Sequence, residues 1–150
     1  MRKVVTWIIV LVGLTACTTE SDVERFIATN PEVYELGQQV YAQNCASCHG
    51  NNGEGQFPDT PMQPDDTGRL GAPPHDDTGH TWHHDDDLLY QIVAEGGMGM
   101  PERFYPMPAF GDQLTEAEIE AVLFYIKTFW TGEQRQRQQQ ATDNVRRQSQ

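Results

Sequence analysis

Apolar residues recur at helical spacing in three separate stretches of the chain. The first stretch has apolar side chains at Val33, Leu36, Val40 and Tyr41. Such spacing is typical of one buried helix face. Asn30-Pro31-Glu32 adds a cap residue, a proline at the first helical position and an acid in the first turn. We therefore expect a helix from about Pro31 to Asn44. Gly37 lies inside it, where glycine costs about 1 kcal/mol relative to alanine, and a close helix crossing would account for it.

Two further helices are predicted nearer the C-terminus. A short one carries Leu88, Leu89, Ile92 and Val93 and ends at Gly96-Gly97. The last has a capping box, because Thr115 is followed three residues later by Glu118. Its apolar face consists of Ile119, Val122, Leu123, Ile126 and Phe129-Trp130, and we expect Gly132 to close it.

The segments between and after these helices are polar. Residues 50–74 are rich in Gly, Pro and Asp, which predicts a long loop, and loops of this length are usually functional or disordered. From residue 133 onward the chain is rich in Gln and Arg and has almost no apolar residue. A segment of this composition cannot bury much apolar surface, so we expect residues 132–150 to be a disordered tail.

The chain begins with the layout of an export signal. Arg2-Lys3 is followed by an apolar run from Val4 to Leu14 and then by small residues. Leu14-Thr15-Ala16-Cys17 resembles a bacterial lipobox, in which the cysteine is acylated and becomes the first residue. The alternative is an ordinary signal peptide that is cleaved near a cysteine. We expect residues 1–16 to be a lipoprotein-type signal peptide and residues 17–30 a flexible tether from a lipidated Cys17.

Composition and charge narrow the classes of partner. Only 37% of the 150 residues are hydrophobic, and the net charge is −12. Such an acidic chain is not expected to bind nucleic acid, which requires a basic face. The charge suits redox partner proteins with a basic docking face, although an acidic surface can also serve solubility alone.

The strongest chemical motif is Cys45-Ala46-Ser47-Cys48-His49. C-x-x-C-H is the attachment signature of haem c, and two cysteines at i and i+3 lie on the same side of a helical turn. The adjacent His49 is then a candidate axial ligand of the iron. A thioredoxin-like pair would need a βαβ pattern, and a zinc site would need two further ligands. Neither accompanies this motif.

Two other clusters contain candidate metal ligands. His75, His80, His83 and His84 lie among five aspartates between residues 76 and 87. This segment is either a second metal site for zinc or copper, or a polar loop that leads into a helix with acids at its N-terminus. A loop rich in Met and Pro follows, in which Met98, Met100 and Met107 could each offer a soft sixth ligand to haem iron. Each of them could equally fill a gap in the core.

From about Glu35 to Trp130, the chain resembles the class I monohaem cytochromes c of bacteria. The resemblance rests on Gly37 and Tyr41 before Cys45-Ala46-Ser47-Cys48-His49-Gly50, and on Met107-Pro108-Ala109-Phe110 before the last helix. It implies an all-α cytochrome c fold, with three to four short helices and long loops wrapped around one covalent haem. It also implies that Met107 is the second axial ligand and that Gly37 approaches the last helix closely. Trp82, Arg69 and Arg103 are candidates to contact a haem propionate, and core packing or simple solvation are the alternatives.

The resemblance implies electron transfer by a non-enzymatic haem protein in a domain of residues 31–131. We expect a carrier tethered by its lipid to the periplasmic side of a bacterial membrane, with the outer membrane slightly favoured by Thr18. Two alternatives remain open. One is a haem subunit of a periplasmic oxidoreductase complex, and the other is a copper-handling or sensing cytochrome that uses the cluster from His75 to His84.

Overall fold

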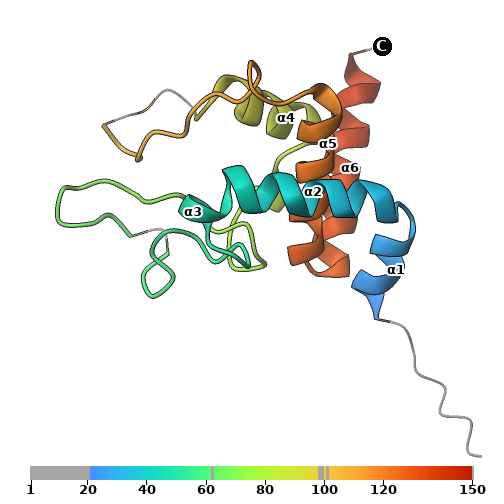
Figure 1. The fold of residues 1–150 in the computed structure, drawn as a ribbon, viewed down its shortest axis with the longest axis horizontal. Helices are drawn as coiled ribbons and strands as arrows, with labels where there is room; N and C mark the ends of the chain where they lie inside the picture. Colours follow the sequence, from blue (N-terminus) through green and yellow to red (C-terminus); the bar gives the residue numbers. More distant parts are fainter. Residues whose placement is uncertain (1–20, 62, 98–99, 101, 150) are drawn as a thin grey trace, which may run out of the picture.

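The chain folds into helices joined by long loops in a computed structural model that describes residues 21–61, 63–97, 100 and 102–149 (Figure 1). The α-helices are α1 (Asp22–Ala28), α2 (Pro31–Asn44), α3 (Ala46–His49), α4 (Asp86–Glu95), α5 (Glu116–Ile126) and α6 (Gly132–Gln148). Two 3₁₀-helices, η1 (Thr81–His83) and η2 (Lys127–Phe129), lie between them. Within the described residues the β-structure is one isolated bridge between Leu70 and Phe104. The predicted all-α class is confirmed.

The domain is organised around the crossing of α2 and α5. A Cβ atom added at Gly37 would lie 2.7 Å from the carbonyl carbon of Ala121, closer still to its oxygen, and 2.8 Å from the Cβ of Tyr125. No side chain larger than hydrogen therefore fits at this position without moving a helix. The predicted close approach of Gly37 to the last apolar helix is confirmed.

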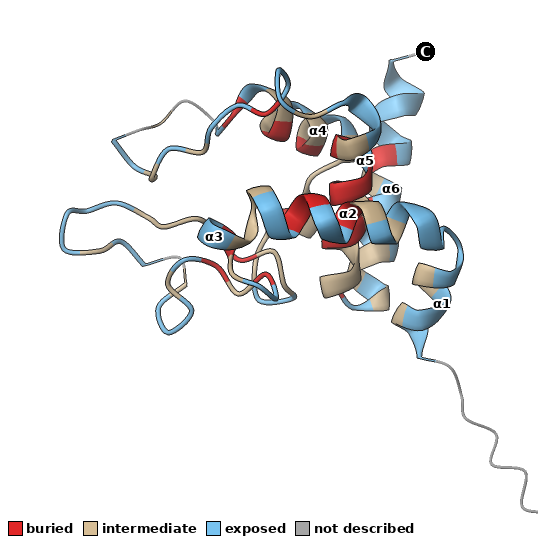
Figure 2. Ribbon diagram, viewed as in Figure 1, coloured by how far each residue is buried: buried red, intermediate tan, exposed pale blue. Residues whose placement is uncertain are grey.

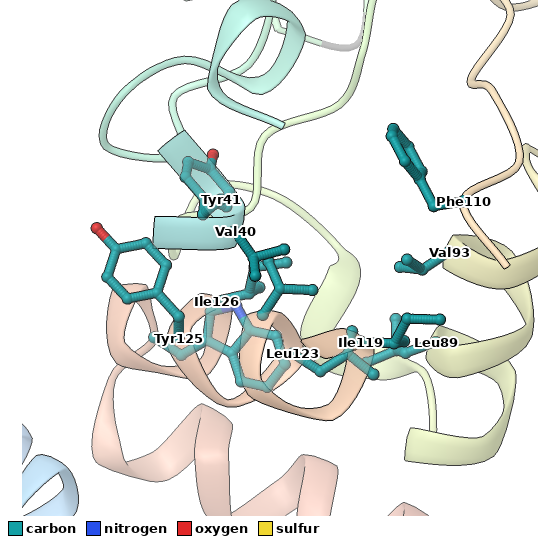
Figure 3. Close-up of a cluster of buried hydrophobic side chains, with 11 residues drawn as sticks. Val40, Tyr41, Leu89, Val93, Phe110, Ile119, Leu123, Tyr125 and Ile126 are labelled. Atoms are coloured by element: carbon teal, nitrogen blue, oxygen red, sulfur yellow. The ribbon is translucent and has the colours of Figure 1, made fainter. Parts of the chain in front are cut away.

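The hydrophobic core lies where α2, α4 and α5 meet, as the buried segments in Figure 2 show. Val40 extends from α2 toward the apolar face of α5, whereas the hydroxyl end of Tyr41 points away from α5, and Leu89 and Val93 extend from α4 (Figure 3). Phe110, from the segment before α5, projects above Val93 on the far side of the cluster from Tyr41. The core thus connects the helix before the C-x-x-C-H motif with the segment that contains Met107.

The predicted helix starts are confirmed, but one predicted end is wrong. Helix α2 runs from Pro31 to Asn44 as expected, and the capping box of Thr115 and Glu118 opens α5. Gly132 does not close that helix. Helix α5 ends at Ile126, η2 follows, and Gly132 is instead the first residue of α6.

The expected disorder of residues 132–150 is wrong, because α6 fills residues 132–148. Thr131 and Gln134 form a capping box at its start. The helix is held by polar contacts rather than an apolar face. Buried Gln138 donates hydrogen bonds to the carbonyl oxygen of His84 (3.2 Å) and to Asp86 Oδ1 (2.7 Å). Buried polar groups that are fully hydrogen-bonded can hold a helix in place, and counting apolar residues misses this.

The expected flexible tether of residues 17–30 also differs from the structure, since α1 occupies Asp22–Ala28. Phe26 stacks on Phe124 of α5, with ring centroids 4.6 Å apart. Asp22 forms an ion pair with Arg135 of α6, whose guanidinium lies over the Phe26 ring. Residues 1–20, including Cys17, lie outside the described part. Among the described helices, none is both long and apolar enough to cross a membrane.

Candidate cofactor site

Cys45, Cys48 and His49 share one tight turn at the end of α2. The carbonyl oxygen of Cys45 accepts hydrogen bonds from the backbone N–H groups of Cys48 (3.1 Å) and His49 (2.9 Å). The turn ends at Gly50, whose positive φ of 82° favours glycine. The Tyr41 hydroxyl donates a hydrogen bond to the Gly50 carbonyl at 2.9 Å, which joins the turn to the core.

The two thiols differ in environment, and both are free. Cys45 is half-buried against the core, and Cys48 is exposed. Burial, and to a lesser degree the neighbouring Cys48, raise the pKa of Cys45 to about 11. Because neither sulfur is in a disulfide, both could attach covalently to a group that lies against this turn.

His49 is buried, with 6% of its surface exposed, and is oriented by the backbone of a distant loop. Its Nδ1 lies 2.9 Å from the carbonyl oxygen of Pro73. Burial lowers the pKa of His49, while the bond to Pro73 acts in the opposite direction. The ring is thus neutral, with Nδ1–H donating to the carbonyl and Nε2 keeping its lone pair. This is the arrangement in which histidine ligates a metal.

The loop that contains Pro73 is fixed to the motif by backbone hydrogen bonds. Gly55 N donates to the His49 carbonyl at 2.7 Å, and the N–H groups of His75 and Asp76 donate to the Gly53 carbonyl at 2.7 and 3.0 Å. The expected long loop is therefore present, and its own backbone hydrogen bonds hold it against the motif.

Met107 lies in a segment that is attached to the end of α4. Gly97 N donates to the Met107 carbonyl at 3.2 Å, and Phe110 N donates to the Val93 carbonyl at 3.1 Å. The Met107 side chain is half-buried against the core cluster that Cys45 also contacts. In Figure 1 this segment and α3 extend toward the same end of the molecule. Met100 is also half-buried, and Met98 lies outside the described residues.

The histidine-rich segment is not built as a metal site. In the described part of the chain, no group of three or more His, Cys, Asp or Glu residues is arranged to hold a metal ion. His80 and His84 meet edge to face with ring centroids 5.4 Å apart, and His83 lies against Trp82. The ring of His75 instead stacks on His49 with centroids 4.0 Å apart. Burial lowers the pKa of His75 well below its ordinary value, so this ring is neutral.

The candidate propionate contacts have other partners in the structure. The indole N–H of Trp82 donates to the Gly79 carbonyl at 3.0 Å, and the side chain packs against the core. The exposed guanidinium of Arg69 lies over the Tyr105 ring at 5.8 Å, and that of Arg103 lies over the Phe104 ring at 5.6 Å. For Trp82 the structure favours core packing, the alternative that the sequence left open.

Sequence reasoning missed Pro73 and His75 as parts of the site. Pro73-Pro74 has no backbone N–H to donate, so this pair offers only carbonyl oxygens. The proline pair downstream of the motif was the available sequence signal that a backbone carbonyl could accept a hydrogen bond from His49. Nothing in the local sequence distinguished His75 from the other histidines of its cluster.

The residues present fit a covalently bound haem. Two free thiols lie one turn apart, and the neighbouring buried imidazole is neutral with Nε2 unprotonated. Thiols, imidazole and a thioether form the donor set that holds c-type haem.

Comparisons with known proteins also indicate a haem-binding cytochrome c domain. The sequence profile of the family described as Cytochrome c matches residues 34–130. The Cbb3-type cytochrome c oxidase subunit CcoP of Azospirillum brasilense is 30% identical over 105 residues, which make up 70% of this chain and 31% of that protein. The FixP subunit of the same type of oxidase from Azorhizobium caulinodans is 29% identical over 97 residues, 65% of this chain and 27% of that protein. The match thus spans less than a third of the length of these two relatives.

A solved structure shares the fold. The crystal structure of cytochrome cL from the marine methylotrophic bacterium Methylophaga aminisulfidivorans aligns over 85% of this chain and 83% of that one. The TM-score is 0.51 and the sequence identity 18%.

Proposed function

The chain belongs to the cytochrome c family of haem electron-transfer proteins, and we propose that it holds one haem c with His49 and Met107 as axial ligands. The observation that carries this proposal is the turn of Cys45, Cys48 and His49. The sequence has a single C-x-x-C-H motif, which supports one haem. When bound, the haem supplies an iron centre that takes up and releases one electron.

Each protein group at the site has a separate task. Cys45 and Cys48 provide the two sulfur atoms for the thioether bonds. The Pro73 carbonyl holds the Nδ1–H of His49, so Nε2 is the nitrogen available to iron. Met107 lies on a segment fixed to α4 and offers a soft thioether, which favours ferrous iron and raises the reduction potential. If His49 and Met107 both ligated the iron, the protein would leave no position on it for a substrate. We therefore propose outer-sphere electron transfer and no enzymatic activity.

Covalent attachment is the first property to test. Denatured protein should retain haem peroxidase staining on a gel, because thioether bonds survive unfolding. The double variant Cys45→Ala/Cys48→Ala should lose the stain. Staining that persists in the double variant would show that the haem is held elsewhere.

We propose that the protein is attached to the periplasmic side of a bacterial membrane through a lipid on Cys17, the outer membrane being slightly favoured. Support comes from the basic start, the short apolar run and the Leu14–Cys17 segment. Multiple acyl chains give stable anchoring where one chain does not. The net charge of −12 suits redox partners with a basic docking face.

A second candidate function is a haem subunit of an oxidoreductase complex. It is favoured by the two relatives described above, which are subunits of a cytochrome c oxidase. Affinity purification from native membranes separates the two functions. A free carrier should elute without stoichiometric partners, whereas a subunit should elute with an enzyme. The third hypothesis, copper handling by residues 75–84, loses support because these histidines do not converge on one point.

A further inference from the structure

We propose that His75 is a positioning residue, which fixes the orientation of the His49 imidazole through a ring stack that Thr81 holds in place. This inference rests on the proposed role of His49 as an axial ligand. It adds a residue of the histidine-rich segment to the haem site, in place of the second metal site that this segment suggested.

The stack of His75 on His49 restricts the one movement that the bond to Pro73 leaves open. The ring centroids are 4.0 Å apart, and the ring planes differ by 20°. The hydrogen bond from His49 Nδ1 to the Pro73 carbonyl sets the direction in which the imidazole points. Rotation about that direction would drive an edge of the His49 ring into the face of His75. Together, the two contacts define both the direction and the plane of the ligand ring.

The His75 ring is held at its edge by a hydrogen bond to Thr81. His75 Nδ1 lies 2.9 Å from Thr81 Oγ1, and Thr81 is buried with 6% of its surface exposed. The same hydroxyl donates to the carbonyl oxygen of Pro74 at 3.3 Å. Because its one proton is used there, the hydroxyl accepts a hydrogen bond from His75 Nδ1–H. This fixes both the tautomer and the rotamer of His75.

The backbone of His75 is fixed as well. Its N–H donates to the Gly53 carbonyl at 2.7 Å, and its carbonyl accepts a hydrogen bond from the indole N–H of Trp130 at 2.8 Å. Helix α6 adds a further attachment, since the Gln134 side chain donates to the Asp77 carbonyl at 3.0 Å. The loop therefore cannot withdraw His75 from His49 without breaking contacts to three separate parts of the fold.

Orientation of an axial imidazole has a measurable effect on iron. Groups around a ligating histidine set its ring orientation and tune the metal. In ferric low-spin haem, the ligand plane determines the splitting of the iron d orbitals, which electron paramagnetic resonance reports as the g values. A residue that only fills space would leave these values unchanged when replaced by another of similar volume.

The test uses haem-loaded full-length protein and compares His75→Leu, Thr81→Val and Thr81→Ser with the wild type. We expect His75→Leu to shift and broaden the ferric g values and to change the midpoint potential. Thr81→Val should shift the g values in the same direction, because it releases the His75 ring. Thr81→Ser keeps the hydroxyl and should retain the wild-type spectrum. The matched control is His83→Leu, which removes an exposed histidine of the same segment and should change nothing.

The proposal is overturned if His75→Leu keeps the wild-type g values and potential, or if His83→Leu shifts them as far. It is also overturned if Thr81→Ser shifts the spectrum as much as Thr81→Val. Should His75→Leu fail to incorporate haem, Thr81→Val decides, and a wild-type spectrum there refutes the proposal. The haem stain of the wild type is a separate measurement, so a failure of the proposed function is distinguishable from a failure of this inference.

Discussion

Replacing Gly37 with alanine tests whether the crossing of α2 and α5 supports the whole domain. Helix propensity alone predicts that Gly37→Ala stabilises the protein by about 1 kcal/mol. The structure predicts the opposite, because the new methyl group would lie 2.7 Å from the carbonyl carbon of Ala121 and 2.8 Å from Tyr125 Cβ. The two nearest atoms belong to the Ala121 backbone, and Tyr125 Cβ is fixed to its own backbone, so no rotamer change can relieve the overlap.

The size of the effect follows from the cost of overpacking. Inserting a methyl group into a filled core typically costs about 1–3 kcal/mol. A clash with backbone belongs at the upper end of this range and should lower the free energy of unfolding by about 3 kcal/mol. The gain in helix propensity offsets about 1 kcal/mol, so the net loss is about 2 kcal/mol. For a domain of this size, a loss of 1 kcal/mol lowers Tm by about 4 °C, so Gly37→Ala should lower Tm by about 8 °C.

The assay is thermal unfolding of the haem-loaded protein, followed by far-ultraviolet circular dichroism. The control is Gln39→Gly, which changes an exposed position two residues further along the same helix. It should lower Tm by less than about 4 °C through propensity alone, because glycine costs about 1 kcal/mol relative to alanine and glutamine is itself slightly less favourable than alanine. A Gly37→Ala variant that unfolds at or above the wild-type temperature would refute the close-crossing argument.

Three further predictions address ligation, anchoring and pH. Met107→Ala should abolish the near-infrared sulfur–iron band of the ferric protein, lower the midpoint potential and allow carbon monoxide to bind. Met100→Ala, the control, should leave the spectrum unchanged. The reverse result would assign the ligand to Met100. Cys17→Ser should stop lipidation and leave either an unprocessed precursor or soluble protein, and a processed, membrane-bound variant would exclude the lipid anchor. The hydroxyl of Thr67 and then that of Tyr105 lower the pKa of Asp65 below its ordinary value. This carboxylate therefore stabilises the fold above an unfolded-state pKa of about 3.9, and the contribution is lost as pH falls toward the lower folded-state pKa. The Tm advantage of the wild type over Asp65→Asn should accordingly be constant near neutral pH and shrink below about pH 4, and an advantage that stays constant to pH 2 would contradict this.

The sequence predicted the elements whose signals are local. Asn30-Pro31 marks the start of α2, and the capping box at Thr115 marks the start of α5. The C-x-x-C-H spacing predicted that the two thiols and His49 share one turn, because all of that geometry is local. The role of Gly37 was also predictable, since an unfavourable residue inside a helix requires a compensating contact.

Contacts between distant segments were not predictable in this way. The bond from His49 to Pro73 and the stack on His75 join residues that are more than twenty positions apart. Helix α6 was missed for a different reason. Its packing depends on hydrogen bonds from Gln138, and hydropathy scores a glutamine as a residue for solvent whether or not its amide finds a buried partner.

The contact between α1 and α6 has an evolutionary consequence. Both helices lie outside residues 34–130, which the family profile matches, yet they are joined to each other through Asp22 and Arg135. Losing either extension would remove this ion pair together with the contact of the Arg135 guanidinium over the Phe26 ring. We therefore expect homologues to inherit the two extensions together or to lack both, with substitutions at positions 22 and 135 correlated across the lineage.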